Sequence, residues 1–99
     1  MKLQVDRTIW HEVFAIARRY DDERVGLGDE FIEALDDSLQ TILSSPQTWP
    51  VWPGIRQASP PIQRYVMDRF PYAVGYQVVG DEVVVVTVAH AKRRPGYWR

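Results

Sequence analysis

The chain has 99 residues, of which 45% are hydrophobic and 25% are charged, and its formal net charge is -1. This length and composition predict a single globular domain over residues 1–99. The absence of cysteine excludes a disulfide framework, a thiolate metal site and a cysteine nucleophile. Two histidines, His11 and His90, are too few for a histidine-built metal site, so we expect no metal and no other cofactor.

The hydropathy pattern favours a cytoplasmic protein. The longest apolar run is residues 83–86, whereas a membrane-spanning helix needs about 20 apolar residues. At the N-terminus, Asp6 and Arg7 introduce charge before the hydrophobic region of a signal peptide could form. We therefore expect neither export nor a membrane partner.

Charge is divided unevenly between the two halves of the chain. Residues 1–50 hold five Lys or Arg against ten Asp or Glu, a net charge of -5, and residues 51–99 hold seven against three, a net charge of +4. Residues 92–99 alone carry four cations and two aromatic side chains. This composition suits binding to a polyanion or an acidic protein segment, and a solvated basic tail is the structural alternative.

The first elements are a short strand and a helix. Residues 3–5 alternate between apolar and polar, which predicts a strand, and Asp6 is a suitable N-cap for a following helix. Apolar side chains then recur in steps of three and four, which predicts a helix from about Arg7 to Glu23. This stripe consists of Ile9, Trp10, Val13, Phe14, Ala17 and Tyr20.

A second helix follows a glycine-containing turn. Gly26 and Gly28 interrupt the first pattern, and a new apolar stripe extends from Leu27 to Leu43. Pro46 ends this helix because the residue before a proline is disfavoured in the helical conformation. Two amphipathic helices joined by so short a turn form a helical hairpin. The next residues, 46–61, contain five of the seven prolines and two tryptophans, Trp49 and Trp52, which predicts a loop anchored by aromatic packing.

The remainder of the chain is rich in β-branched and aromatic residues. It predicts strands over residues 62–70, 72–79 and 82–90, with Gly80-Asp81 as a two-residue hairpin turn between the last two. Residues 83–88 are nearly all β-branched, which predicts a central strand buried on both faces. The fold class is therefore α+β, in the order β-α-α-β-β-β, with the helical hairpin packed on a small, mainly antiparallel sheet.

Several strings together resemble the RelE/ParE superfamily of toxins from type II toxin–antitoxin systems, over nearly the whole chain. They are Tyr20, Gly26-Leu27-Gly28 and Phe31, then Pro46 and Pro50, then residues 69–76 (Arg-Phe-Pro-Tyr-Ala-Val-Gly-Tyr), and residues 88–98 (Val-Ala-His-Ala-Lys-Arg-Arg-Pro-Gly-Tyr-Trp). The resemblance implies the same β-α-α-β-β-β fold. It also implies a cognate antitoxin that forms a hetero-oligomer with the chain, its C-terminal segment lying over the helical hairpin and along the sheet.

The superfamily contains two activities that need different chemistry. ParE-like members poison DNA gyrase by binding it, and RelE-like members are metal-independent endonucleases that cut messenger RNA, mostly on the ribosome. Metal-independent cleavage requires a base, an acid and fixed cations around one phosphate. The resemblance makes His90, Arg93 and Tyr97 the candidate catalytic residues, and Arg56, Arg69, Arg93 and Arg94 could hold phosphate.

Position 73 favours the ParE-like branch. RelE-like nucleases usually carry an arginine directly after the strand tyrosine, and this chain has Ala73 after Tyr72. The Gly-Leu-Gly turn and the C-terminal Arg-Arg-Pro-Gly-Tyr-Trp string also resemble ParE or plasmid-stabilisation proteins more closely. The leading hypothesis is thus a toxin that binds gyrase; the alternatives are a messenger-RNA endonuclease and an inactive relative kept as a binding module. The expected target-binding residues are Arg69, Lys92, Arg93, Arg94, Tyr97 and Trp98.

Several of these residues also have purely structural interpretations. His90 could cap backbone groups at the end of its strand. Tyr72 and Tyr76 share one face of a strand, which favours packing over base stacking. Arg69 could form a surface ion pair with Asp68 or Asp29.

Overall fold

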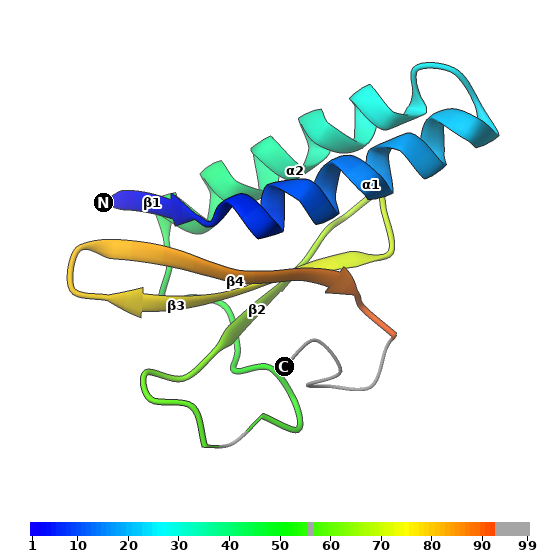
Figure 1. Cartoon of the computed structure of the whole chain (residues 1–99). Coiled ribbons are helices and arrows are strands. Elements are labelled where there is room, and N and C mark those ends of the chain that lie inside the picture. Colours follow the sequence, from blue (N-terminus) through cyan, green and yellow to red (C-terminus); the bar gives the residue numbers. More distant parts are fainter. Residues whose placement is uncertain (56, 93–99) are drawn as a thin grey trace.

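The structure, a computed structural model, describes residues 1–55 and 57–92. Six elements follow in the order β1 (Lys2–Val5), α1 (Arg7–Glu23), α2 (Leu27–Ser44), β2 (Gln63–Val66), β3 (Tyr72–Val79) and β4 (Glu82–His90). The two helices lie side by side over one face of a four-stranded sheet (Figure 1). The α+β class and the β-α-α-β-β-β order are confirmed. In the described part of the chain, no helix is long and apolar enough to cross a membrane.

The sheet has the strand order β1-β4-β3-β2. Strand β1 pairs with β4 in parallel, and the other two pairings are antiparallel, so the sheet is mainly antiparallel as predicted. Strand β4 is central and has side chains in both layers: Val83 and Val85 pack beneath the helices, and Ala89 belongs to a second cluster on the opposite face. This confirms the prediction for residues 83–88. Strand β1 begins at Lys2, one residue earlier than predicted.

A bulge in β4 determines which way its last residues face. The pairing with β3 shifts register so that Val86 is an extra residue in β4. An extra residue reverses the alternation of side chains beyond it. Val85 before the bulge and Val88 beyond it therefore both pack beneath the helices. His90, two residues after Val88, lies on the same helix-facing side and pairs in register with Tyr72 of β3.

Helix α1 has the predicted bounds, and Asp6 is its N-cap. The backbone carbonyl of Asp6 accepts hydrogen bonds from the N–H groups of Ile9 and Trp10. Its carboxylate accepts a hydrogen bond from the hydroxyl of Thr8 and forms no side-chain cap of the helix. The helix is therefore started by main-chain bonds, and most of its stability comes from the buried apolar face.

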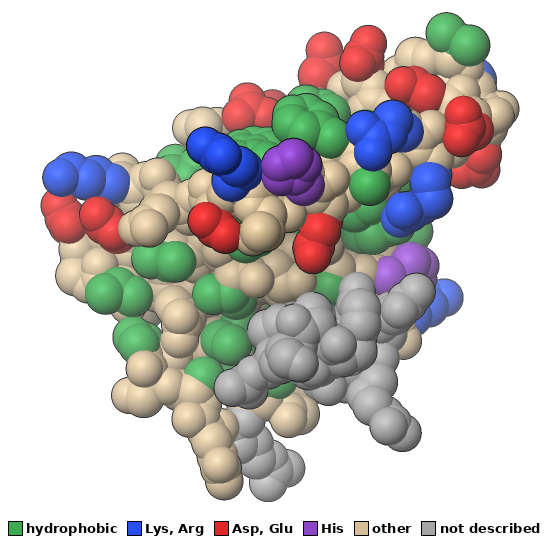
Figure 2. Space-filling model, in the orientation of Figure 1, with side chains coloured by type: hydrophobic (Ala, Val, Ile, Leu, Met, Phe, Trp, Pro, Cys, Tyr) green, Lys and Arg blue, Asp and Glu red, His purple; other side chains and the backbone are tan. Residues whose placement is uncertain are grey.

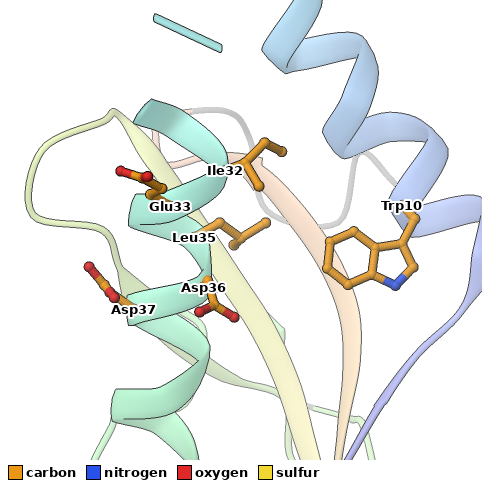
Figure 3. A pocket seen from close by; sticks show the side chains of 6 residues that line it. All are labelled: Trp10, Ile32, Glu33, Leu35, Asp36 and Asp37. Atoms are coloured by element: carbon orange, nitrogen blue, oxygen red, sulfur yellow. The ribbon is translucent and has the colours of Figure 1, made fainter. Parts of the chain in front are cut away.

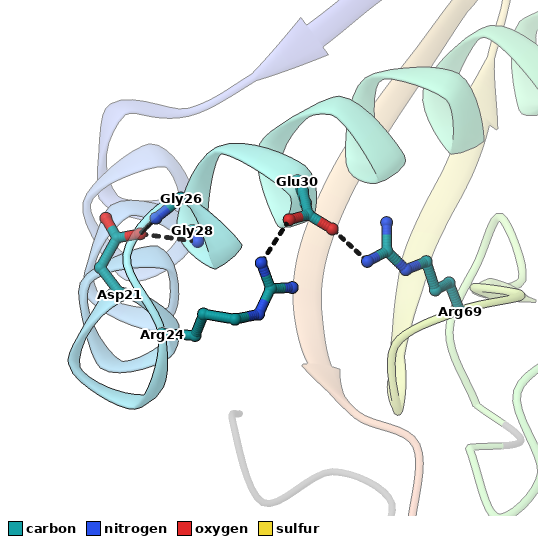
Figure 4. A network of polar contacts seen from close by, with 6 residues as sticks. All are labelled: Asp21, Arg24, Gly26, Gly28, Glu30 and Arg69. Carbon is teal, nitrogen blue, oxygen red and sulfur yellow. Dashed lines mark hydrogen bonds and ion pairs between the residues drawn. The ribbon is translucent and has the colours of Figure 1, made fainter.

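The turn between the helices depends on two glycines for two different reasons. Gly26 has a φ of +92°, a left-handed conformation that L side chains rarely adopt. Gly28 has no space for a side chain, because a Cβ there would lie 2.4 Å from the backbone carbonyl oxygen of Ala17. The carboxylate of Asp21 accepts the N–H groups of Gly26 (3.2 Å) and Gly28 (2.8 Å) (Figure 4). These contacts hold α1 and α2 close together at the turn.

Strand β2 is shorter than the sequence predicts. The expected strand covered residues 62–70, and the observed strand is Gln63–Val66. The N–H of Met67 donates to the carbonyl of Tyr72 at 2.9 Å, which closes a turn before β3 begins. Pro71 lies inside this turn, where its missing N–H costs no ladder hydrogen bond. The apolar residues of the turn therefore extend the core without extending the sheet.

The proline-rich loop packs on the sheet through its two tryptophans, as predicted. The ring of Trp49 meets that of Tyr65 edge to face, with centroids 4.7 Å apart. Trp52 is 2% exposed and packs with Ala73 and Ala89 on the sheet face opposite the helices. The loop thus covers part of the second face of the sheet, which contributes to its burial (Figure 1).

Buried polar contacts fix the start of this loop. The side-chain amide of Gln63 donates to the carbonyls of Pro46 and Trp49, both at 2.8 Å. The hydroxyl of Tyr76 donates to the Pro46 carbonyl at 2.6 Å. Because Tyr76 is fully buried, the expectation that this ring packs in the core is confirmed.

Alkaline pH is expected to destabilise the fold through Tyr76. Burial raises the pKa of this phenol from 10.0 to about 12. The folded state holds the proton more tightly, so the stabilisation is complete below pH 10 and is lost as the pH rises from 10 toward 12. The loss at pH 11 is about 1.4 kcal/mol. Urea unfolding at pH 8 and pH 11 checks this: Tyr76→Phe should lose less stability between the two pH values than the parent, and equal losses would contradict it.

Candidate functional site

His90 lies at the end of β4 beside Tyr72. The two rings meet edge to face, with centroids 5.5 Å apart. The backbone N–H of Lys92 donates to the Nδ1 atom of His90 at 3.2 Å. Since Nδ1 is an acceptor, the proton of the neutral imidazole is on Nε2. This contact agrees with the structural interpretation of His90 as a cap for backbone groups at the strand end.

A pocket of about 230 Å³ lies between α1 and the adjacent ends of β3 and β4. It is lined by Ile16, Arg19, Tyr20, Glu23, Pro71, Tyr72 and His90. The Tyr20 ring packs against those of Phe31 and Phe70, and burial raises the pKa of its phenol. Arg19 and Glu23 carry opposite charges. The described residues of the pocket therefore offer hydrogen bonds without the concentration of positive charge that stabilises a pentacoordinate phosphate.

No group of three or more His, Asp or Glu side chains within residues 1–55 and 57–92 could hold a metal ion. Among the described residues that line the pocket beside His90, Glu23 is the one carboxylate, and Arg19 is a cation. The described lining offers hydrogen bonds and aromatic packing.

Arg69 is bound to the helical hairpin. It forms an ion pair with Glu30 in the first turn of α2, and the same carboxylate contacts Arg24 at 3.0 Å (Figure 4). Hydrogen bonds from Arg69 and then from Arg24 hold the pKa of Glu30 below its usual value. The expectation that Arg69 pairs with Asp68 or Asp29 is wrong. Successive helix residues point about 100° apart, and it is Glu30 that faces the turn before β3.

The other predicted contact residues lie at or beyond the end of the described chain. Lys92 is exposed, and its side chain forms no ion pair with another described residue. Of the residues named from the sequence, five lie outside the described ranges: Arg56, Arg93, Arg94, Tyr97 and Trp98. Of the predicted site, the structure thus places Arg69, His90 and Lys92. His90 and Lys92 are in contact with each other, whereas Arg69 is paired with Glu30 of α2.

The sheet face opposite the helices is mainly apolar. Ala73 is fully buried there in the cluster formed by Trp52. A Cβ at Gly75 would lie 2.8 Å from the methyl group of Thr87 and 3.0 Å from the Trp52 ring, so the ring rests directly on the sheet. A long side chain at position 73 could reach solvent only by displacing this layer.

Arg64 is a residue on this second face that the sequence analysis did not single out. It is in register with Gly75, and its guanidinium lies 5.7 Å from the centre of the Trp52 ring. Its Nε atom is buried and has no hydrogen-bond partner in the described structure. Side chains alternate between the two faces of β2, and Gln63 and Tyr65 on either side of Arg64 are buried. This alternation is the sequence signal that could have identified Arg64 as a residue of the opposite face.

Two grooves run along the helical layer. One of about 420 Å³ lies between Trp10 of α1 and the middle of α2, and Figure 3 shows the indole facing that helix. Its α2 lining consists of Ile32, Glu33, Leu35, Asp36 and Asp37. A second groove of about 290 Å³ lies between α2 and β2 and shares Glu33 and Asp37. The sequence predicted neither groove, since helical periodicity identifies buried stripes and not the gap between two helices.

Comparison with solved structures finds the same fold in a chain of the structure described as "Chromosomal ParDE TA system from P. aeruginosa". The match covers 93% of this chain and 97% of that one, with a TM-score of 0.68 and 15% sequence identity. Neither a protein-family model nor the sequence of a curated protein matches the chain. At this identity the similarity establishes the fold, and the fold implied by the RelE/ParE resemblance is therefore confirmed.

Proposed function

We propose that the chain is the toxin of a type II toxin–antitoxin module and that it acts in the cytoplasm by binding DNA gyrase. A cognate antitoxin binds it in a hetero-oligomer and neutralises it. The proposal is supported by the fold shared with a chain of the ParDE system and by the ParE-like strings at the Gly-Leu-Gly turn and the C-terminus. The predicted contact surface combines Arg69 and Lys92 with Arg93, Arg94, Tyr97 and Trp98.

The burial of Ala73 is the observation that carries the choice of binding over RNA cleavage. In the nuclease branch, the resemblance places a phosphate-binding arginine at this position. Here the side chain is a methyl group with 0% exposure, beneath the Trp52 cluster. The methyl group of Ala73 cannot hydrogen-bond a phosphate. The cation that would neutralise the reaction's developing charge is therefore missing from that point of the sheet.

The positions of His90 and Arg64 also support a binding function. His90 faces the helical layer next to Tyr72, while Arg64 lies on the opposite face over Trp52. Acid–base catalysis of RNA cleavage requires the proton-transfer group and the phosphate-binding cation within hydrogen-bond reach of the same phosphate. A sheet lies between these two side chains, so they cannot share one.

Messenger-RNA cleavage is the second candidate, and Arg64 is the observation that favours it. This guanidinium lies on the same face as Ala73, two residue pairs away along the β2–β3 ladder, and its Nε has no partner in the described structure. A cation on a neighbouring strand could replace the missing arginine. Arg93 and Tyr97 would then have to supply the groups that His90 cannot bring to that face.

Purified protein is expected to inhibit gyrase and to leave RNA intact. In a DNA supercoiling assay, gyrase activity should fall with increasing protein, and primer extension on cellular messages should show no new cuts after induction. Arg64→Ala should leave growth arrest unchanged, because binding to gyrase does not use this buried face. Codon-positioned cuts that disappear in Arg64→Ala, with supercoiling unaffected, would establish the nuclease instead.

The antitoxin is tested by co-expression with the product of the adjacent gene. The two proteins should co-purify, and co-expression should restore growth. If the chain arrests growth but no neighbouring product binds it, the module assignment is wrong while the toxin assignment stands. If the chain alone is well tolerated and leaves gyrase active, it is a binding module without toxicity.

A further inference from the structure

One exposed line along α1 combines positive charge with an aromatic ring. Its members recur in steps of three and four, so they share one face of the helix: Arg7, His11, Phe14 and Arg18. Phe14 is 49% exposed, and its ring stacks on the half-buried ring of Trp10 with centroids 6.0 Å apart. Arg7 and Arg18 form no ion pair with another described residue. This line therefore exposes an aromatic surface between two uncompensated cations.

A second exposed line runs along α2 and has the opposite charge. The same steps of three and four connect its members: Asp29, Glu33, Asp36 and Gln40. Its three carboxylates form no ion pair within residues 1–55 and 57–92, and like charges at these spacings repel one another. Figure 2 shows acidic side chains along the upper edge of the helical layer, over α2, and a histidine with Lys or Arg below them, over α1. Hydrophobic side chains lie between the two groups.

The two lines are matched in height along the hairpin. A Cβ at Gly28 of α2 would lie 2.4 Å from the carbonyl oxygen of Ala17 of α1, so the helices touch at this level. The residues that follow these two, Arg18 and Asp29, are therefore at nearly the same height. Phe14 lies one turn further from the hairpin turn, where the groove lined by Ile32 begins. A positive position on one helix thus lies beside a negative position on the other.

A face with both signs in matched positions is complementary to itself. A two-fold axis parallel to the helices lays α1 of one copy along α2 of the other and keeps every residue at its height. Arg18 of each copy then meets the partner's Asp29, and Phe14 meets the partner's Ile32. A two-fold axis across the helices would instead place α1 on α1 and α2 on α2, which opposes like charges. A partner of a single sign would leave one of the two lines unpaired.

We propose that the chain forms a homodimer through these two lines, with α1 of each copy packed on α2 of the other. The partly exposed aromatic rings lie at the centre of the contact, and the ion pairs lie at its rim, as in other protein interfaces. The dimer is a property of the chain alone and goes beyond the proposed function. If that function holds, the second copy and an antitoxin segment over the hairpin exclude each other.

Charge reversal on each line tests the arrangement in the full chain. Analytical ultracentrifugation over a range of concentrations should show a monomer–dimer equilibrium that weakens as salt is raised. Arg18→Glu and Asp29→Lys should each weaken the dimer about a hundredfold, tenfold for each of the two symmetric contacts. An equimolar mixture of the two variants should dimerise again, because both contacts of the mixed dimer then join opposite charges.

Matched controls make the same charge changes away from the two lines. Arg19→Glu alters an exposed cation on the side of α1 that faces Tyr72 and His90, and Asp81→Lys alters the turn between β3 and β4. Each should dimerise like the parent, alone and in their mixture. Phe14→Ala should weaken the dimer about tenfold by removing the central ring. Circular dichroism checks that every variant is folded.

Three results would overturn the proposal. They are a parent chain that is monomeric at every concentration, a mixture of Arg18→Glu and Asp29→Lys that stays monomeric, or equal weakening in the line and control variants. These results are independent of the toxin assignment. If the chain is monomeric but inhibits gyrase and co-purifies with the adjacent gene product, the dimer inference fails while the proposed function stands.

Discussion

Replacing Arg93 and Arg94 together with Ala is expected to abolish growth arrest without unfolding the protein. The two residues belong to the half of the chain with a net charge of +4, and with Lys92 they form three adjacent cations. Such a cluster is stabilised by an anionic partner surface. A substitution on a solvated surface changes stability by only about 0.5 kcal/mol, so lost toxicity in a folded variant would report lost contact with the target. Growth after induction and gyrase supercoiling measure the effect.

The matched control is the other adjacent arginine pair of the chain, Arg18 and Arg19. Both are exposed on α1, in the half with a net charge of -5, and their replacement by Ala removes the same charge. This control should keep its toxicity. Removal of the Trp98 side chain separates folding from contact at the C-terminus. If the Arg93/Arg94 variant folds, binds antitoxin and remains as toxic as the parent, the basic C-terminus is not the target-binding surface.

The helical hairpin could be predicted almost to the residue because its signals are local. The apolar stripe of α1 repeats every three to four residues, and the bounds Arg7–Glu23 followed from it. For α2, the glycines before Phe31 and the proline after Ser45 fixed the two ends from neighbouring residues alone. The two-residue turn at Gly80-Asp81 was equally local.

Features that depend on pairing between distant residues could not be predicted. The bulge at Val86 lies in a run of four valines. Because the residues are identical, the sequence does not indicate which of them face the helices and which face the other side of the sheet. The bulge nevertheless decides that His90 faces the helices. The shortening of β2 depends on the bond from Met67 to Tyr72, which is set by where β3 pairs. Both are properties of the sheet register, and alternation within one strand does not specify register.

The sequence named residues for the candidate site but did not indicate which of them are in contact. Tyr72 and His90 were each named from the sequence, and the register of β3 and β4 brings their rings into contact. The ion pair between Arg69 and Glu30 joins residues 39 positions apart, and the sequence analysis named Asp68 and Asp29 in place of Glu30. Ala73 was noticed as a missing arginine, but its burial beneath Trp52 required the path of the proline-rich loop. The argument against phosphate binding is therefore stronger from the structure than from the sequence.

Gly28→Ala is expected to lower the free energy of unfolding by roughly 3 kcal/mol, the upper part of the usual range for overpacking. The added Cβ would lie 2.4 Å from the carbonyl oxygen of Ala17 and 2.8 Å from the carboxylate of Asp21. The first of these atoms is backbone within α1 and cannot rotate away. The helices must therefore separate, which also weakens the hydrogen bond from the Gly28 N–H to Asp21. Urea unfolding followed by circular dichroism measures the loss.

Gly26→Ala is the internal control, because it places a side chain on a residue with left-handed backbone conformation but brings its Cβ into contact with no other atom. Nothing lies within 4 Å of a Cβ at Gly26, and its cost is the left-handed φ of +92°, about 1–2 kcal/mol. Gly28→Ala should therefore be the more destabilising of two substitutions only two residues apart. Equal stability losses would mean that the hairpin opens at little cost, and that the close approach at Gly28 does not hold α1 and α2 together.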